Sequence, residues 1–355
     1  MSMNEVRKKL VKDAAECSFI PWEKLDGKTV VITGATGLIG GFVVDALLER
    51  MESRSERTKI ALLARDPDRA LNHFANAHCS AVQWDAADPK SLDIDADFIL
   101  HLACDTSSSA FLNRPVETIA TVVNGTRSVL DLARSCSARL CIASTMEVYA
   151  SGGTVPLTEE MGGALDAMNP RSSYPQAKQL AETLVAAYSA EFGVPACVAR
   201  LCQTFGAGVR SDDGRVFAEF ARCCAEGRDI VLLTPGEKRN MYLSVQDAAL
   251  ALLLLMIEGE PGEAYNVANE STLCSVREMA EMVVGRFGGG VTSVLIEADQ
   301  AAAARFRAPG TIIQDTTRLR DLGWNPSGGL LDIYEEMMAD WELGWQECGA
   351  TGLVD

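Results

Sequence analysis

Residues 28–41 read KTVVITGATGLIGG, a β-branched run followed by glycines three residues apart and then by a helical pattern. A strand that leads into a helix through such a turn is the setting in which a glycine cluster binds phosphate. Gly34 permits the tight turn, Gly37 lets the backbone approach a pyrophosphate, and Gly40 lets the helix pack on the strand. The first N–H groups and positive dipole end of the helix would meet the pyrophosphate. The segment therefore predicts a dinucleotide-binding turn.

Short apolar runs alternate with longer helical patterns after this turn. Such alternation is typical of a parallel sheet covered by helices on both faces. We therefore expect an α/β fold with a doubly wound parallel sheet of the Rossmann kind, whose ligands lie at the carboxyl edge of the strands. The expected strands are 28–33, 59–64, 81–86, 97–103, 139–145 and 196–201, and the expected helices are 38–50, 116–135 and 175–192.

The alternation loosens after about residue 203, which indicates a second and smaller α/β unit. We expect a dinucleotide-binding domain with the catalytic residues at 28–202 and a C-terminal substrate lobe mainly at 203–345. Residues 1–27 carry apolar residues among charges and predict an amphipathic helix plus a strap, and 346–355 form a tail. The lobe is expected to contain helices at 216–226 and 245–258 and a short strand in AYNVAN (264–269).

Composition limits the class of partner. The net charge is -17 and the pI near 4.7, which argues against nucleic acid or an anionic membrane surface as partner. No apolar run reaches the roughly 20 residues that span a bilayer, and the N-terminus lacks the apolar region of a signal peptide. The 11 cysteines are scattered without a CxxC pair, so we expect buried thiols in a cytoplasmic protein, and no metal.

A tyrosine and a lysine form the strongest chemical signal. Tyr174 and Lys178 lie four apart at the start of a predicted helix, so they share one face. A phenol is a poor base at neutral pH, but an adjacent ammonium and a nicotinamide cation would lower its pKa. Tyr174 could then take a proton from a substrate hydroxyl while hydride leaves to the nicotinamide, and Lys178 would hold the nicotinamide ribose. A strand end about thirty residues earlier adds the hydroxyls of Ser144 and Thr145.

The order of glycine loop, Ser/Thr strand end and YxxxK helix resembles the short-chain dehydrogenase/reductase superfamily. GATGLIG and the chain length indicate its extended branch, the NAD-dependent nucleotide-sugar epimerases and dehydratases. The resemblance implies a nucleotide-diphosphate sugar substrate, oxidised transiently at C4, with Thr145 bonded to the reacting hydroxyl. It also implies a homodimer that pairs through helices 116–135 and 175–192. It extends from Gly27 to about Tyr334 through Pro115, NGT (124–126), PRSSYPQAK, AYNVAN and DTTRLRDLGWNP.

The choice between NAD and NADP depends on the end of the second strand. Arg65 would favour the 2'-phosphate of NADP. Asp66 would instead favour NAD, provided that its carboxylate can reach the 2'-hydroxyl of the ribose, so the sequence leaves both cofactors possible. Asp85 resembles the family's adenine contact, while His101 and Asn124 are expected to be structural. The cofactor contacts implied in full are Gly34, Thr36, Gly37, Leu38, Ile39, Arg65, Asp85, Ala86, Leu102, Ala103, Tyr174 and Lys178.

The segment STMEVYA distinguishes reaction types within the branch. It resembles STDEVYG of hexose 4,6-dehydratases and STSEVYG of glucuronate decarboxylases, and Glu147 matches the glutamate of both. Dehydratases carry an aspartate before that glutamate, which protonates the leaving hydroxyl, but here the residue is Met146. A thioether cannot donate that proton. Epimerisation, decarboxylation or an elimination led by Glu147 stay open, with Thr145, Glu147, Tyr174 and Lys178 as the catalytic set.

Residues for the sugar diphosphate depart from the family pattern. The family uses an Asn after the sixth strand, where this chain has Gln203, and an Arg at the position of Asn240, beside Arg239. Arg210 and Arg215 are alternative cations that are more typical of a solvated surface. The expected substrate contacts are Thr106, Ser107, Met146, Gln203, Arg239 and Asn240.

Three functions follow from these features. The leading hypothesis is an enzyme that epimerises, decarboxylates or dehydrates a nucleotide sugar by transient oxidation with bound NAD or NADP. The alternatives are a net NADPH-dependent reductase, favoured by Arg65, and a noncatalytic NAD(P)-binding redox sensor, disfavoured because Thr145, Tyr174 and Lys178 occur together.

Overall fold

The computed structural model describes residues 4–55, 57–106, 108–150, 153, 155–298 and 311–341, with the backbone alone for 108–110. Seven parallel strands form its central sheet, in the order β10-β6-β5-β4-β1-β2-β3. The order reverses between β1 and β4, which opens a crevice at their carboxyl ends. The strands are β1 Thr29–Thr33, β2 Lys59–Ala64, β3 Cys79–Gln83, β4 Phe98–His101, β5 Arg139–Thr145, β6 Ala196–Leu201 and β10 Ala264–Val267.

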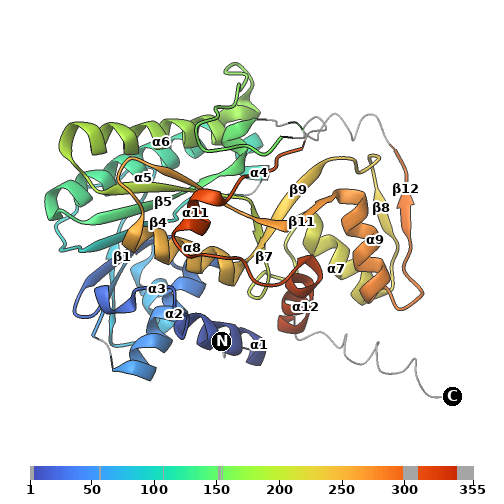
Figure 1. Cartoon of the computed structure of the whole chain (residues 1–355), viewed down its shortest axis with the longest axis horizontal. Helices are drawn as coiled ribbons and strands as arrows, with labels where there is room; N and C mark the ends of the chain where they lie inside the picture. Colours follow the sequence, from blue (N-terminus) through green and yellow to red (C-terminus); the bar gives the residue numbers. More distant parts are fainter. Residues whose placement is uncertain are drawn as a thin grey trace.

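Helices cover both faces of this sheet (Figure 1). On one face lie α5 (Pro115–Cys136) and α6 (Ser173–Phe192), and on the other α2 (Leu38–Arg54) and α8 (Val245–Glu258). Neighbouring residues of β1 enter opposite cores: Val30 and Ile32 pack on the α2 side and Val31 on the α5 side. A strand buried on both faces reads as a continuous apolar run, as TVVIT does. The predicted doubly wound parallel sheet is confirmed.

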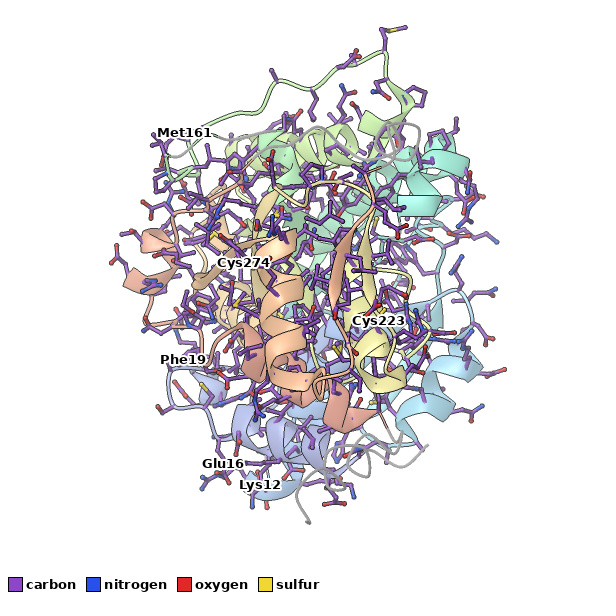
Figure 2. The ribbon with its side chains drawn as sticks, turned by 90° about the vertical axis from the view of Figure 1, so that its right-hand side faces the viewer. Lys12, Glu16, Phe19, Met161, Cys223 and Cys274 are labelled. Atoms are coloured by element: carbon purple, nitrogen blue, oxygen red, sulfur yellow. The ribbon has the colours of Figure 1, made fainter. Side chains whose placement is uncertain are left out.

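A second unit is built on two smaller sheets with its own core, at the right of Figure 1. The side view of Figure 2 faces this unit, with Cys223 and Cys274 both in it. Both thiols are buried with Phe205 and Tyr334 in one apolar cluster. Its sheets are β11-β9-β7 (Asn269–Ser275, Arg239–Ser244, Gln203–Phe205) and β12-β8 (Val294–Ile296, Ile230–Leu232), and its helices are α7 (Val216–Glu226), α9 (Val276–Phe287) and α12 (Leu330–Asp340).

The two units interleave along the chain. The AYNVAN segment, expected in the lobe, supplies β10 at the edge of the central sheet, paired with β6. Helix α8, also expected in the lobe, packs on the central sheet, because it is buried almost all round from Val245 to Ile257 and needs apolar partners on several sides. The strands expected at 81–86 and 97–103 end early, at Gln83 and His101, where pairing with β2 and β1 ends.

The N-terminal segment forms α1 (Glu5–Ala15) and a short 3-10 turn, η1 (Trp22–Lys24). Val11 and Ala14 of α1 are buried, whereas Lys12 lies at the surface at the lower edge of Figure 2. Arg7 forms an ion pair with Asp45 of α2 at 2.9 Å, and Asn4 Nδ2 donates to the carbonyl of Ala339 at the end of α12. The segment thus joins the dinucleotide helix to the C-terminal unit.

Ten cysteines of the described residues are free thiols, of which six are buried. The expectation that all would be buried is therefore wrong for four, Cys17, Cys79, Cys104 and Cys136, which lie in loops, on an edge strand or at a helix end and are half-buried. Across the described ranges, every helix is too short or too polar to cross a membrane.

Candidate active site

The glycine loop is shaped by close contacts of the backbone. Gly34 has φ +70°, and a Cβ there would lie 2.9 Å from the amide nitrogen of Ala103. A Cβ on Gly40 would lie 2.3 Å from the carbonyl oxygen of Gly34, so only glycine fits at that position. Gly37 caps α2 and is exposed, and a Cβ there would meet only the Gly34 oxygen within 4 Å, at 3.2 Å. The loop thus leaves an open cradle at the helix N-terminus that fits a dinucleotide pyrophosphate. The other predicted contacts of this loop are Thr36, exposed, and Leu38 and Ile39, both half-buried.

A buried hydrogen-bond cluster ties this loop to the end of β4. The backbone N–H groups of Leu102 and Ala103 both donate to Thr33 Oγ1 at 3.0 Å, and that hydroxyl lies 2.8 Å from His101 Nδ1. The hydroxyl proton is therefore directed at His101. Burial, followed by the charge of Lys178, lowers the pKa of His101 to about 3, so the ring is neutral. His101 has the structural role that was expected, whereas Thr33 was not anticipated.

The predicted adenosine contacts lie at the ends of β2 and β3. Arg65 is exposed, while the carboxylate of Asp66 caps helix α3 (Pro67–Phe74) by accepting from the backbone N–H of Arg69 at 3.0 Å. Asp85 is exposed and accepts from the backbone N–H of Ala87, whereas Ala86 is buried. Contact of these residues with a cofactor stays a prediction. Asn124 Nδ2 donates to the carbonyl of Ala87 at 2.8 Å, the structural contact that was expected.

The structure brings Thr145, Tyr174 and Lys178 together. Tyr174 and Lys178 lie in the first turns of α6, and both are about 95% buried. Lys178 Nζ lies 5.9 Å from the centre of the Tyr174 ring and donates to the carbonyl of Ala143, next to Thr145, at 2.6 Å. Thr145, the last residue of β5, shares a side-chain hydrogen bond with Tyr174. A hydroxyl donor, a phenol and a cation therefore converge at one point of the sheet edge.

The charge state of this trio differs from the expectation. Burial, with added repulsion from Cys104 and Glu147, raises the pKa of Tyr174 well above its usual value. Burial also lowers the pKa of Lys178, although Glu182 and Cys104 oppose this. The expected lowering of the phenol pKa by Lys178 is therefore wrong for the protein alone, because the phenol is desolvated and the lysine donates to a carbonyl instead. Stabilising the phenolate needs a further positive charge at this point.

Two further residues of the site, both close to Tyr174, were not predicted from the sequence. Phe111, on α4 (Ser108–Asn113), stacks on the Tyr174 ring with centroids 4.3 Å apart and an interplanar angle of 8°. The Arg171 guanidinium lies 5.2 Å from the centre of the Phe111 ring, and its Nη2 lies 3.4 Å from Glu147 Oε2. An arginine three residues before Tyr174 in PRSSY was the available signal. Nothing local in the sequence connects Phe111 to a helix that begins 62 residues later.

The turn after β5 points two adjacent residues in different directions. Residues Met146–Tyr149 form a 3-10 turn, η2, in which the backbone N–H of Glu147 donates to Thr145 Oγ1 at 3.2 Å. The side chain of Met146 is buried in the core shared with α8, whereas Glu147 pairs with Arg171. Substrate contact by Met146 stays a prediction. No residue of acidic character occupies the position where a dehydratase needs one.

The predicted substrate residues are spread over β7, β9 and the loop after β4. Gln203 is half-buried on β7, Asn240 is buried on β9, and the neighbouring Arg239 pairs with Glu278 at 3.0 Å. Thr106 is exposed, and Ser107 lies outside the described residues. Their contact with substrate stays a prediction. The alternative cations Arg210 and Arg215 form ion pairs with Asp212 and Asp213.

Comparison with known proteins agrees with this geometry. The model of the NAD dependent epimerase/dehydratase family matches residues 30–268. UDP-glucuronic acid decarboxylase 6 of Arabidopsis thaliana is 29% identical over 88% of this chain and 89% of its own length. UDP-glucuronic acid decarboxylase 5 of the same plant is 30% identical with the same coverage.

Solved structures share the fold. UDP-glucose 4-epimerase of Thermotoga maritima, crystallised with UDP-glucose, has a TM-score of 0.72 at 19% identity, over 88% of this chain and 98% of that one. A dTDP-glucose 4,6-dehydratase of Streptomyces venezuelae, with bound NAD, has a TM-score of 0.73 at 19% identity, over 89% and 98%. With its glycine cradle beside Thr145, Tyr174 and Lys178, the chain belongs to the NAD-dependent epimerase/dehydratase family and is an NAD-dependent enzyme that modifies nucleotide sugars.

Proposed function

We propose that the chain decarboxylates a nucleotide-linked hexuronic acid, with UDP-glucuronate as the first substrate to test. The observation that carries the proposal is the pair of Arg171 and Glu147 beside Tyr174. An arginine is suited to binding a carboxylate because its donors match the two oxygens. Relatives that align along most of the chain are named as UDP-glucuronic acid decarboxylases, which supports this choice.

The residues would divide the chemistry between them. The glycine loop from Gly34 to Gly40 would hold NAD, which supplies reversible hydride transfer at C4 when bound. Tyr174 takes the proton of the C4 hydroxyl, Thr145 holds that oxygen by a hydrogen bond, and Lys178 supplies positive charge nearby. The C4 ketone then lies two carbons from the C6 carboxylate, and a β-keto acid loses carbon dioxide readily because the ketone accepts the electron pair. A proton must afterwards reach C5, and we assign its control to Glu147, whose charge acts on Tyr174.

The composition of the turn after β5 disfavours dehydration. Elimination of water from C5 and C6 needs an acid to protonate the leaving hydroxyl, and Met146 cannot supply it. Epimerisation at C4 needs no residue for a carboxylate, so it would leave Arg171 without a role in the reaction. Decarboxylation uses both Arg171 and Glu147.

The deciding experiment is incubation of the purified protein with UDP-glucuronate, UDP-glucose and dTDP-glucose, followed by mass spectrometry of the products. If the chain is a decarboxylase, UDP-glucuronate should lose about 44 Da, the mass of carbon dioxide. dTDP-glucose should not lose the roughly 18 Da of a water molecule. Isomerisation of UDP-glucose at constant mass would favour an epimerase, and a gain of two hydrogens a net reductase. Unchanged UDP-glucuronate, in protein that converts another sugar, would overturn the proposal.

We further propose that the chain forms a homodimer through α5 and α6. Large apolar side chains are exposed on these helices, including Val116 (79%), Ile119 (44%) and Leu180 (47%). Burial of such a patch against a second copy would remove apolar area from water. Sedimentation of the protein beside a Val116→Glu, Leu180→Glu variant tests it, and a wild-type monomer at micromolar concentration would refute it.

A further inference from the structure

Behind the catalytic residues lies a half-buried ion pair that no local motif of the sequence indicates. Glu182 of α6 and Arg200 of β6 meet at 2.8 Å, with only 12% and 11% of their side chains exposed. Arg200 donates to both oxygens of Glu182 through Nε and to one of them through Nη2. Removing two charges from water is costly, so this pair is not explained as a simple source of stability.

One arm of the pair reaches the strand that ends at Thr145. Ser144 and Arg200 are cross-strand partners in β5 and β6, and Ser144 Oγ donates to Glu182 Oε1 at 2.5 Å. One turn earlier on the same helix, Lys178 donates to the carbonyl of Ala143 at 2.6 Å. Helix α6 is therefore attached to the last residues of β5 at two successive points. Together these contacts restrain the position of Thr145 and the position of the Lys178 ammonium relative to the end of β5.

A second arm reaches the turn that carries Glu147. Arg200 Nη1 donates to the hydroxyl of Tyr149, at the end of η2, at 2.8 Å, and to the carbonyl of Glu159 at 2.9 Å. The Tyr149 hydroxyl in turn donates to Asn266 Oδ1 at 2.7 Å. The pair thus holds both ends of the segment from Ser144 to Tyr149, because Glu182 accepts from Ser144 and Arg200 donates to Tyr149. Thr145 and Glu147 lie between these two attachment points.

We propose that Glu182 and Arg200 are positioning residues: the pair holds Thr145 and Glu147 in register with Tyr174, and Glu182 keeps Lys178 positively charged. The proposal rests on the proposed role of Tyr174 as base. Glu182 lies one turn after Lys178 on the same helix, so its carboxylate favours the ammonium form, and Arg200 partly offsets that field. The two partners therefore act on Lys178 with opposite sign.

Several other charged and titratable groups lie around α6 and also contribute to the electrostatic potential at Lys178 and Tyr174. The charges of Cys104 and Glu182 act on Lys178 directly, whereas Arg200 acts on it through its bonds to Glu182. Groups on the elements packed against α6 are His101 of β4, Glu147 of η2, Arg171 of η3 (Pro170–Ser172), Arg200 of β6, and Asp131 and Arg127 of α5, which face Tyr188 toward the far end of the helix. All of them are unchanged in the variants below except the pair itself.

The test uses the NAD-loaded full chain carrying Glu182→Gln, Arg200→Gln or both. The first readout is the pH profile of kcat with UDP-glucuronate. The second is the ultraviolet absorbance of the phenolate against pH, taken as the difference between each protein and the same protein with Tyr174→Phe. Asp45→Asn is the matched control, because its ion pair with Arg7 is similarly shielded, with 15% exposure on both sides.

Glu182→Gln removes a negative charge beside Lys178, so it is expected to move the alkaline limb of kcat down by about one pH unit and to lower slightly the pH at which the phenolate forms. Arg200→Gln is expected to move both in the opposite direction, and the double variant to lie between. Asp45→Asn should lower Tm and leave both profiles unchanged. Shifts of the same sign in the two single variants, or no shift in either, would overturn the proposal.

A substitute variant covers the case in which Glu182→Gln does not fold, and one readout does not depend on the proposed substrate. If Glu182→Gln does not fold, Glu182→Asp replaces it: the charge is kept but the reach to Ser144 is shortened, so kcat should fall about tenfold with an unchanged alkaline limb. A limb that moves would contradict the assigned roles. The phenolate titration needs no substrate, so it still tests the pair if UDP-glucuronate is left unchanged, a result that contradicts the proposed function alone.

Discussion

The turns after β1 and β5 lie on the same edge of one sheet but are built by different means. After β1, the turn depends on glycines that have no side chain. At Gly34 and at Gly40, backbone atoms of other residues lie within 3 Å of the place that a Cβ would occupy. After β5, buried side chains hold the turn, with Ser144 and Tyr149 both bonded to the pair of Glu182 and Arg200. The first turn exposes backbone N–H groups to an anion, and the second fixes side chains that act on a substrate.

A site built from backbone and a site built from side chains differ in how far a sequence can reveal them. A backbone cradle needs glycine at fixed local spacings, so it is visible within fourteen residues. A side-chain site draws on residues from β5, α6, β6 and α4, and its geometry depends on how those elements meet. Substitutions at the two turns should therefore fail in different ways, one through cofactor binding and one through turnover.

The largest effect is expected at the β5 side. Tyr174→Phe removes the proposed base and should lower kcat about 10²- to 10⁴-fold while leaving the affinity for NAD within about twofold. Steady-state kinetics and NAD titration measure both quantities. Tyr188→Phe, on the same helix with its hydroxyl bonded to Asp131, is the matched control and should keep full turnover. Unchanged kcat in Tyr174→Phe would show that Tyr174 is not the base.

A cofactor defect is expected at the β1 side. Gly40→Ala places a methyl group 2.3 Å from the Gly34 carbonyl oxygen, which should cost about 3 kcal/mol and weaken NAD binding roughly 100-fold. Calorimetric titration with NAD measures it. The neighbouring Gly41→Ala is the control, because its nearest contacts are at 3.5 Å. Equal NAD affinity in the two variants would show that close backbone approach is not what shapes the loop.

Loss of the ion pair between Arg171 and Glu147 should weaken substrate binding. Arg171→Met removes the guanidinium beside Glu147, and loss of a charged hydrogen bond of about 2 kcal/mol should raise KM for UDP-glucuronate about 30-fold. Arg286→Met is the matched control, since Arg286 also lies over a phenylalanine, Phe287, and pairs with a glutamate, Glu335. A rise in KM as large in the control would point to general destabilisation.

The smallest expected effect concerns the residue between the two turns. His101 is neutral in the fold, with a pKa of about 3 set mainly by burial, but takes up a proton near pH 6.5 once unfolded. The unfolded state then binds more protons, so stability is full above pH 6.5 and falls as the pH drops below it, by up to about 1.4 kcal/mol per pH unit.

Chemical unfolding between pH 7 and 5.5 tests this point. His101→Gln should flatten the pH dependence of the unfolding free energy, whereas His78→Gln, which alters an exposed ring, should leave it as in the wild type. A wild-type slope that persists in His101→Gln would mean that other groups cause it.

Much of the fold could be predicted because its signals are local. The expected strands 59–64, 139–145 and 196–201 coincide with β2, β5 and β6, since apolar runs bounded by polar residues mark strands buried on both faces. The place of AYNVAN could not be predicted, because a short apolar strand fits either sheet until its pairing partner is known. The roles of Phe111 and Arg171 also required knowing that α4 and η3 lie over Tyr174.

The sheet class, the glycine cradle, the set of Thr145, Tyr174 and Lys178 and the family could be inferred from the amino-acid sequence alone, because each depends on residue types at short fixed spacings. Three features required the folded chain: the direction of the Tyr174 pKa, the pairing of Glu147 with Arg171, and the attachment of the β5 turn to Glu182 and Arg200. Burial and the meeting of side chains from distant segments are properties of packing, which no local spacing encodes.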